Sequence, residues 1–294
     1  MKIKHLRNKE IEYARWDKCI SMSYNQLSYA YTWYLDVVSP NWEALVSEDY
    51  CYIMPLPLKK KYGIPYLVQP VLTQQLGIFS ERPIEQYIVD EFIRQIPNFS
   101  YELHFNEQNF HSEVPAHPNY ILNLNHTYEE IASGFSKNTI RNIIKAQKLG
   151  LVIQKGIELE KFLEFYYSVE KNYKPTEKSV VERLIKKGML EGAMTLFGVY
   201  SPDNEMIAAL CILHSLHRFT YLLPVSSIKG KSSSAMFLLI NKLIEENAGK
   251  NIFLDFEGSR LEGVARFYRG FGAINQPYYI LKRFRPAFLI NNKI

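Results

Sequence analysis

The regular succession of short apolar strands and amphipathic helices after residue 190 constrains the fold more than any other feature of the sequence. Three apolar segments, 193–200, 206–216 and 218–225, are separated by polar turn residues, and this spacing predicts an antiparallel meander. Two helix-like segments then alternate with the strand-like segments NIFLDF and PYYILKRF. A helix that joins two strands of one sheet usually makes those strands parallel. We therefore expect an α/β fold of the α+β type, with a locally parallel crossover.

The first part of the chain is less regular, and its character changes near Asn125. Expected helices there alternate with short aromatic strands such as YELHF and YILNL. No flexible linker is apparent between the two parts, so we expect the two halves to pack tightly against each other. We predict a first domain over residues 1–124 and a second domain, with the active site, over residues 125–294.

Composition excludes several classes of protein. The chain has 294 residues, of which 47% are hydrophobic and 22% charged, so it can bury its own core and is neither disordered nor collagen-like. Its net charge of +5 permits an anionic partner without requiring one. The apolar run at 206–213 is far shorter than the ~20 residues of a membrane span. The N-terminal sequence lacks the apolar core of a signal peptide, so we expect a cytoplasmic location.

The cysteines and histidines do not have the spacing of a metal site. Cys19, Cys51 and Cys211 lie far apart and form no C-x-x-C pair, which is typical of reduced thiols. His214 and His217 are three residues apart, but no third ligand accompanies them. We predict that the protein uses no metal.

A basic helix is expected over residues 137–148. Its cations are three or four residues apart and form one stripe, made of Lys137, Arg141, Lys145 and Lys148. Ile140, Ile143 and Ile144 lie on an adjacent face and are expected to dock the helix on the protein. The stripe is either an ordinary solvated face or a surface for an anionic ligand.

The segment SSIKGKSSSA, residues 226–235, has the composition of a phosphate-binding helix start. Gly230 permits close approach of the backbone, and free N–H groups at a helix N-terminus bind phosphates. A Walker A loop is excluded because its first glycine falls on Val225. The alternative is a helix that is merely well capped by its serines. The residues predicted to bind a donor cofactor are Ser227, Gly230, Lys231 and Ser232.

The segment LDFEGS, residues 254–259, supplies two carboxylates. On a strand, Asp255 and Glu257 share one face, at the C-terminal end where α/β sheets usually bind ligands. Such carboxylates can take a proton from an amine nucleophile. The alternative is that Asp255 caps a turn or pairs with a nearby arginine, such as Arg260 or Arg266.

A short helix is expected in the segment ARFYRGFGA, residues 265–273, which ends at two glycines. Phe267 and Phe271 are one turn apart and can share an apolar face. Arg269 is a candidate for contact with an anion, although such a segment is more often core and cap.

Three motifs, in this order, resemble those of the FemAB/FemX-like proteins of the GNAT superfamily. NTIRNIIKAQKLG at 138–150 is similar to N-x-R-x-x-I-x-K-A-x-K-x-G, LDFEGS to F-D-F-x-G-S, and FYRGFG at 267–272 to F-K-x-x-F-G. The resemblance is strong over residues 120–285 and loose over the first 119. The family's lysine in the third motif falls on Tyr268, and the acyl-CoA loop of GNAT enzymes retains only its central glycine, Gly230.

The resemblance implies two tandem GNAT-like acyl-CoA N-acyltransferase domains. It further implies transfer of an acyl or aminoacyl group to an amine, with acyl-CoA or aminoacyl-tRNA as the donor. The implied acceptor is a cell-envelope precursor, a sugar or another small molecule. The chain lacks the long charged coiled-coil arm of the tRNA-using branch.

We therefore predict an N-acyltransferase. Its candidate catalytic residues are Asp255, Glu257 and Tyr268. Its candidate contacts with an anionic donor or acceptor are Arg141, Lys145 and Arg269. The alternative is a non-catalytic GNAT-like binding protein, since a fold alone does not guarantee activity. A third hypothesis is an RNA-binding protein that uses the basic helix, with tRNA as a possible partner.

Overall fold

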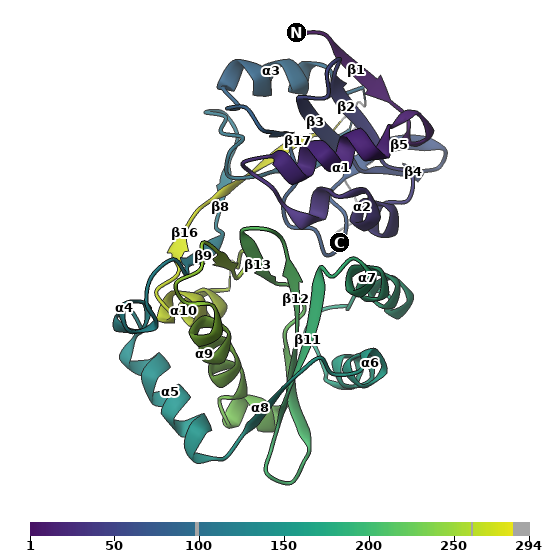
Figure 1. Cartoon of the computed structure of the whole chain (residues 1–294). Helices are drawn as coiled ribbons and strands as arrows, with labels where there is room; N and C mark the ends of the chain where they lie inside the picture. Colours follow the sequence, from purple (N-terminus) through teal and green to yellow (C-terminus); the bar gives the residue numbers. More distant parts are fainter. Residues whose placement is uncertain (98–99, 260, 285–294) are drawn as a thin grey trace. The chain divides into compact units, whose positions relative to one another are not determined.

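The computed structural model describes residues 1–97, 100–259 and 261–284 (Figure 1). The chain forms two compact units. Among the described residues, unit 1 contains those up to 117 and 277–284, and unit 2 contains those from 118 to 276. Within the described ranges, no helix is both long and apolar enough to span a bilayer.

Unit 1 contains two sheets with helices packed beside them. The first sheet has the order β1-β2-β3-β6, with strands β1 (Ile3–Leu6), β2 (Glu43–Ser47), β3 (Tyr52–Leu56) and β6 (Phe79–Ser80). The second has the order β4-β5-β7-β17-β8, with strands β4 (Leu58–Lys61), β5 (Ile64–Val68), β7 (Tyr101–Phe105), β17 (Tyr278–Arg283) and β8 (Ala116–His117). The α-helices described in this unit are α1 (Tyr13–Met22), α2 (Thr32–Val38) and α3 (Gln86–Arg94).

One strand of unit 1 comes from the far end of the chain. β17 pairs antiparallel with β7, where Tyr279 lies opposite Phe105, and its first residues pair with β8. Tyr279 and Leu281 pack against the apolar core of this unit, which includes Phe92 and Phe105. The sequence pattern assigns this segment to the strand–helix alternation of the second half, but its alternating apolar side chains complete the sheet of unit 1 instead.

Unit 2 is built on one large sheet. Its order is β10-β11-β12-β13-β15-β9-β16, and β14 pairs with β12. Its strands are β9 (Tyr120–Asn123), β10 (Val152–Lys155), β11 (Met194–Tyr200), β12 (Met206–His214), β13 (Arg218–Tyr221), β14 (Val225–Ser226), β15 (Phe253–Asp255) and β16 (Ile274–Asn275). Its helices are α4 (Tyr128–Ser133), α5 (Lys137–Lys148), α6 (Leu159–Ser168), α7 (Lys178–Leu190), α8 (Ile228–Ser232), α9 (Ala235–Asn247) and α10 (Glu262–Gly270).

The meander and the parallel crossover predicted for the second half are both confirmed. β11 and β12 form an antiparallel hairpin in which Met194 lies opposite Leu213. At its turn, the N–H of Asn204 donates to the carbonyl of Ser201 at 2.9 Å. β13 pairs parallel with β15, across the α8–α9 connection. The predicted mixed α/β fold class is therefore confirmed.

Helices cover both faces of the β11–β12 hairpin, with α5, α9 and α10 on one side and α6 and α7 on the other (Figure 1). α9 is apolar around most of its circumference, as expected for a helix packed on several sides. Its side chains Leu239, Ile240 and Ile244 are fully buried and share a core with Leu210 and Ile212 of β12. This core supports the segments that form the candidate site.

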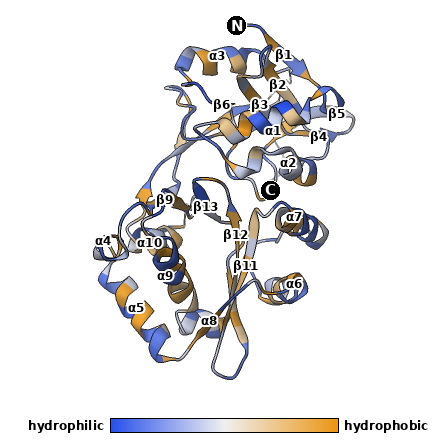
Figure 2. Cartoon of the chain, in the orientation of Figure 1, coloured by the Kyte–Doolittle hydropathy of each residue, from blue (hydrophilic) through white to orange (hydrophobic). Residues whose placement is uncertain are grey.

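The predicted basic helix is α5, and its docking face differs from the expected one. The Ser136 Oγ atom caps it by accepting the N–H of Thr139 at 3.1 Å. Thr139, Ile143 and Ala146 are buried, whereas Ile140 and Ile144 are 42% and 44% exposed. The expectation that all three isoleucines dock the helix was wrong, because smaller side chains fill most of the close contact. Hydrophobic and hydrophilic stretches accordingly alternate along α5 (Figure 2).

Candidate functional site

Two pockets of unit 2 meet at an irregular strand. Between β13 and β14, the N–H groups of Leu222 and Leu223 both donate to the carbonyl of Cys211, at 3.1 and 3.4 Å. Such bulges often redirect side chains beside a binding site. The residues that line both pockets are Pro224, Val225, Ser226 and Lys231. The irregular segment therefore forms a common wall of the two pockets.

The first of these, called the aromatic pocket below, has a volume of 520 Å³. The end of β13, the start of α9 and one face of α10 provide its aromatic side chains, Tyr221, Phe237, Phe267 and Tyr268. The rings of Phe237 and Phe267 meet edge to face, with 4.7 Å between their centroids. An apolar lining with a few polar groups is the usual form of a small-molecule site.

Tyr268 is the predicted catalytic residue that lines the aromatic pocket. Its ring stacks on Phe256 with 4.9 Å between the centroids. Burial raises the pKa of its phenol well above the ordinary value, and the negative charges of Glu257 and Asp255 act in the same direction. The phenol therefore remains protonated near neutral pH and can donate a hydrogen bond.

Asp255 is 1% exposed and does not line the aromatic pocket. Its Oδ2 atom accepts a hydrogen bond from Nη1 of Arg218 at 2.8 Å, and its Oδ1 atom accepts one from the N–H of Glu257 at 2.8 Å. The expected arginine partner is present, but Arg218 comes from the adjacent parallel strand rather than from the following helix. Arg260, one of the arginines considered, lies outside the described residues. Paired in this way, the Asp255 carboxylate holds the loop that follows β15.

Glu257 lies beyond the strand rather than on it. β15 ends at Asp255, and Glu257 has a φ angle of 60°, in the left-handed region. The expectation that both carboxylates share one strand face was therefore wrong, because the alternation stops two residues earlier. Its carbonyl also accepts the N–H of Tyr120 at 3.1 Å. Left-handed residues other than glycine cost about 1–2 kcal/mol and often mark functional loops.

The start of α8 is packed tightly onto β12. The Oγ atom of Ser227 accepts the N–H of Gly230 at 3.1 Å and donates to the carbonyl of Ile207 at 3.1 Å. A Cβ atom at Gly230 would lie 2.0 Å from the carbonyl oxygen of Ile207. Glycine is thus required for the contact between helix and strand. Its N–H is occupied by the serine cap, so the geometry of this position favours the capped-helix interpretation.

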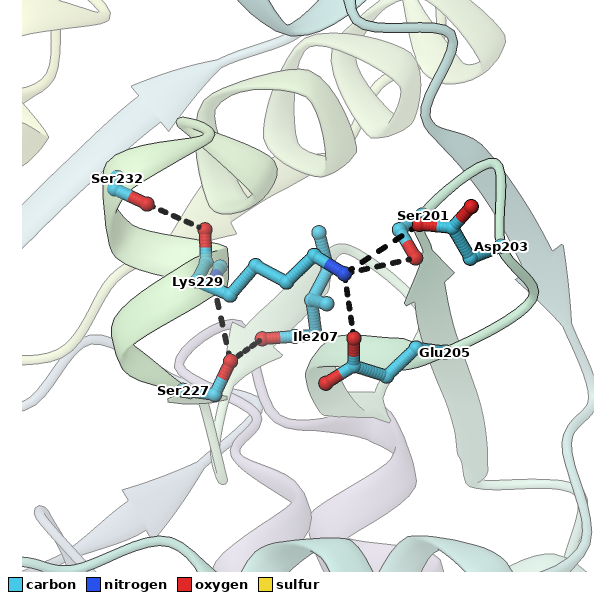
Figure 3. Close-up of polar contacts among 8 residues, drawn as sticks. Ser201, Asp203, Glu205, Ile207, Ser227, Lys229 and Ser232 are labelled. Carbon is cyan, nitrogen blue, oxygen red and sulfur yellow. Dashed lines mark hydrogen bonds and ion pairs between the residues drawn. The ribbon is translucent and has the colours of Figure 1, made fainter.

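The two lysines on either side of Gly230 differ in their partners. Nζ of Lys229 reaches the β11–β12 turn, where it lies 2.5 Å from Oε2 of Glu205 and 3.8 Å from Oδ2 of Asp203 (Figure 3). The hydrogen bond to Glu205 raises the pKa of Lys229. The ammonium group of Lys231, in contrast, has no partner within the described part of the chain, and this residue lines both pockets. Lys231 is therefore the cation of α8 that remains available to a ligand.

The second pocket, called the polar pocket below, has a volume of 1010 Å³ and lies between the end of α6, the segment after it and α8. Lys171 in its wall is fixed: its Nζ atom donates to the carbonyl of Val169 at 2.9 Å and lies 4.2 Å from the centre of the Tyr166 ring. Burial lowers the pKa of Lys171. Besides the paired Glu205 and Lys229, exposed Glu170 and Lys231 provide this pocket with a further charge of each sign.

The remaining predicted contact residues lie elsewhere. Arg141 and Lys145 are exposed on α5 and line neither pocket. Arg269 is exposed and pairs with Glu262 of its own helix. The Oγ atom of Ser232 donates to the carbonyl of Lys229 at 3.0 Å. The structure thus brings Lys231 and Tyr268 to one pocket but does not bring these four residues there.

Sequence reasoning missed several residues of the site. Tyr221 and Phe237 line the aromatic pocket, and Arg218 pairs with Asp255, yet none of them stands out in the sequence. Phe267 carries a detectable signal, since it opens the FYRGFG motif. Among the residues of the described ranges, no three His, Cys, Asp or Glu side chains gather as a metal site.

Comparison with protein families supports the resemblance read from the motifs. The model of the FemAB family matches residues 57–179, a range that includes the motif at 138–150. The resemblance to this family is thereby confirmed. No curated relative matches the sequence at a significant level.

Solved structures provide the fold comparison. A FemX crystal structure superposes with a TM-score of 0.71 at 10% identity, covering 100% of both chains. The L-PGS structure from Bacillus licheniformis gives 0.53 at 10% identity, covering 85% of this chain and 86% of that one. A tandem GNAT protein from the clavulanic acid biosynthesis pathway gives 0.52 at 10% identity, covering 96% and 98%. The predicted tandem GNAT-like fold is therefore confirmed.

Proposed function

We propose that the protein is an N-acyltransferase that moves an aminoacyl group from an activated ester to an amine. The aromatic pocket carries this proposal, because it combines an apolar cavity, the protonated phenol of Tyr268 and the accessible cation of Lys231. An anionic donor would be held by Lys231, and the apolar part of the transferred group by the aromatic walls. The likeness to FemX and the match to the FemAB family support the same reaction class.

Tyr268 has the role of a hydrogen-bond donor in this proposal. Its phenol would stabilise the negative charge that develops on the carbonyl oxygen as the amine attacks. Glu257 is the proposed acceptor of the amine proton, since its charge already acts on Tyr268. As the new amide bond forms, the ester C–O bond breaks, and Glu257 would pass the proton to the leaving oxygen of the donor. We propose that Asp255 positions the loop that carries Glu257, because both of its carboxylate oxygens already accept hydrogen bonds.

The geometry of α8 favours an aminoacyl ester over acyl-CoA as the donor. A CoA pyrophosphate needs several free N–H groups at a helix start. The Gly230 N–H is used by Ser227, and Lys229 is neutralised by Glu205. We therefore propose aminoacyl-tRNA as the donor and acyl-CoA as the competitor to be tested beside it.

The polar pocket is the proposed site of the acceptor. It shares a wall with the aromatic pocket, so an amine bound there lies next to the donor. The carboxylate of Glu170 can hold an ammonium group. We propose a peptide-bearing cell-wall precursor as the acceptor class, in a cytoplasmic reaction, on the basis of the FemAB resemblance.

A second candidate is a non-catalytic binding protein. The observation that favours it is that the Asp255 carboxylate and the Gly230 N–H already have hydrogen-bond partners within the protein, so neither can act on a ligand. Such a protein would bind the same ligands without turnover.

The experiment measures transfer of a labelled amino acid from aminoacyl-tRNA to a panel of amines that includes nucleotide-linked cell-wall peptides. We expect Tyr268→Phe to lower kcat about 100-fold and Lys231→Gln to raise the KM for the donor about tenfold. Lys242→Gln is the matched control, because Lys242 is an exposed lysine of α9 that pairs with Glu245. It should leave both constants unchanged.

Calorimetry with acetyl-CoA completes the test. Lys231→Gln is the better probe of donor binding than any change at Gly230, where a side chain would disrupt the packing on β12. If acetyl-CoA binds with micromolar affinity and Lys231→Gln abolishes this binding, acyl-CoA rather than aminoacyl-tRNA would be the donor. Binding of aminoacyl-tRNA without transfer to any amine would favour the second candidate, and full turnover by Tyr268→Phe would contradict the role of the phenol.

A further inference from the structure

α5 presents an exposed face that the proposed transfer reaction does not use. Four cations lie along its 12 residues, and the helix contains no acidic residue. Lys137, Lys145 and Lys148 have no ion-pair partner among the residues that the structure describes, and Arg141 donates only to its neighbour Asn138 in that set. Like charges one turn apart repel each other, so this arrangement gains stability when an anionic surface neutralises it.

The same face exposes large aliphatic side chains. Ile140 and Ile144 are one helical turn apart and therefore form a row beside the cations. They are 42% and 44% exposed, while Ile143 of the same helix is buried. A surface that binds nucleic acid gains little affinity from aliphatic side chains, because contacts with phosphates dominate the affinity for nucleic acids. Aliphatic side chains next to lysines are the pattern of a helix that lies in a membrane interface.

We propose that α5 docks the protein on an anionic phospholipid surface. Ile140 and Ile144 enter the boundary between headgroups and acyl chains, and the four cations contact the lipid phosphates. Each lysine or arginine near such a surface strengthens binding about fivefold. The inference concerns a partner of the protein and does not depend on the proposed transfer reaction.

α5 is firmly attached to the aromatic pocket. Oγ of Ser234, which lines that pocket, donates to Oδ1 of Asn142 at 2.7 Å. On α10, a Cβ atom at Gly270 would lie 2.5 Å from Oγ1 of Thr139, so the two helices are in close contact. Docking of α5 would therefore hold the pocket near the membrane surface, where a lipid-linked acceptor could reach it. This last consequence alone depends on the proposed function.

The test measures co-sedimentation of the full chain with vesicles of phosphatidylcholine, with or without phosphatidylglycerol. We expect binding only to the mixed vesicles, weakened by added salt. The double change Arg141→Gln/Lys145→Gln should lower partitioning about 25-fold. Ile140→Ser/Ile144→Ser should lower it roughly tenfold through the lost apolar burial. Both pairs are exposed, and circular dichroism would verify that the variants fold.

α7 supplies the matched control. Lys178 and Leu190 are exposed at its two ends, so Lys178→Gln/Leu190→Ser removes the same kinds of side chain from another helix of unit 2. This control should bind as the unaltered chain does. Equal binding to both kinds of vesicle, no effect of the isoleucine changes, or an equal loss in the control would overturn the proposal. Binding of tRNA that depends on the cations, with no vesicle binding, would make α5 an RNA surface instead.

Discussion

α5 and α7 have the same number of cationic side chains, but ion pairs with nearby carboxylates are described only on α7. Each helix has four cationic side chains. On α7, Lys186 pairs with Glu182 at 2.6 Å and Lys187 with Glu191 at 2.9 Å. α5 contains no carboxylate. Two of the four cations of α7 are thus paired, whereas none of α5 has an ion-pair partner among the described residues, and this contrast agrees with the anionic partner proposed for α5.

The two faces of the sheet also differ in how closely their helices approach it. At Gly230 of α8, which leads into α9, the nearest obstacle to a Cβ atom is the backbone carbonyl of Ile207 at 2.0 Å. At Gly188 of α7, the nearest obstacle is the side chain of Met194, with Cγ at 2.5 Å. A methionine side chain can move, whereas a carbonyl within a strand cannot. On the side of the sheet with the aromatic pocket, the helix packing therefore tolerates less change than on the other side.

The largest expected effect concerns these two glycines. Gly230→Ala should lower the free energy of unfolding by about 3 kcal/mol, because α8 must move away from β12. Gly188→Ala should cost less than about 1 kcal/mol, since Met194 can adjust and alanine favours the helix. Denaturant titration of both variants measures the difference.

Gly263 provides the control for these substitutions. It lies in α10, and no atom lies within 4 Å of the position that a Cβ atom would occupy there, so Gly263→Ala should stabilise the protein by about 0.5–1 kcal/mol. Equal losses at Gly230 and Gly188 would show that the two faces are equally adaptable, and the comparison would fail.

A smaller effect concerns pH and His214 at the end of β12. Its ring meets Phe219 edge to face at 4.5 Å, beside the core of the aromatic-pocket side. Burial, with a smaller contribution from Lys155, lowers its pKa to about 4. Since the unfolded chain binds this proton near pH 6.5, stability should be complete above pH 6.5 and fall by about 2 kcal/mol as the pH decreases to 4.

Substitution of the histidines separates this contribution from others. His214→Gln should flatten the loss of stability between pH 6.5 and 4 in thermal unfolding experiments. His217→Gln removes an exposed histidine from the same turn and should retain the original dependence on pH. An unchanged pH dependence in His214→Gln would show that the buried ring does not titrate in this interval.

The smallest expected effect is a change in stability when single charges on α5 and α7 are altered. Lys137 is the first residue of α5, where a positive charge opposes the helix dipole, so Lys137→Glu should stabilise the protein by about 0.5 kcal/mol. The same change should weaken vesicle binding. On α7, Glu182→Gln removes a pair with Lys186 and should slightly lower stability in a salt-dependent way. Vesicle binding that survives Lys137→Glu unchanged would contradict the assigned role of α5.

Much of the fold could be predicted from local patterns. The hairpin of β11 and β12 follows from two apolar runs around a four-residue turn, and the parallel strand β15 follows from the intervening helix. The partner of β17 could not be predicted, since its alternating side chains fit either sheet and only packing selects the one in unit 1. For the same reason the buried face of α5 could not be read from hydrophobicity alone.

The candidate site could be predicted only in part. Tyr268 and Lys231 can be found because they lie in recognisable motifs, and both line the aromatic pocket. Arg218 was missed because its pairing with Asp255 arises from strand neighbours 37 residues apart. Glu257 was wrongly placed on the strand, because a left-handed residue after a strand end has no signal in the sequence unless it is glycine or asparagine.

The origin of β17 has a consequence for the order in which the molecule forms on the ribosome. β7 and β8 are synthesised before unit 2, but the strand that lies between them is synthesised after it. At 5–20 residues per second, translation of residues 118–276 occupies roughly 8 to 32 s. During that time the edges of β7 and β8 remain open to wrong partners. Unit 2 can therefore fold during synthesis before the strand that completes the sheet of unit 1 has been made.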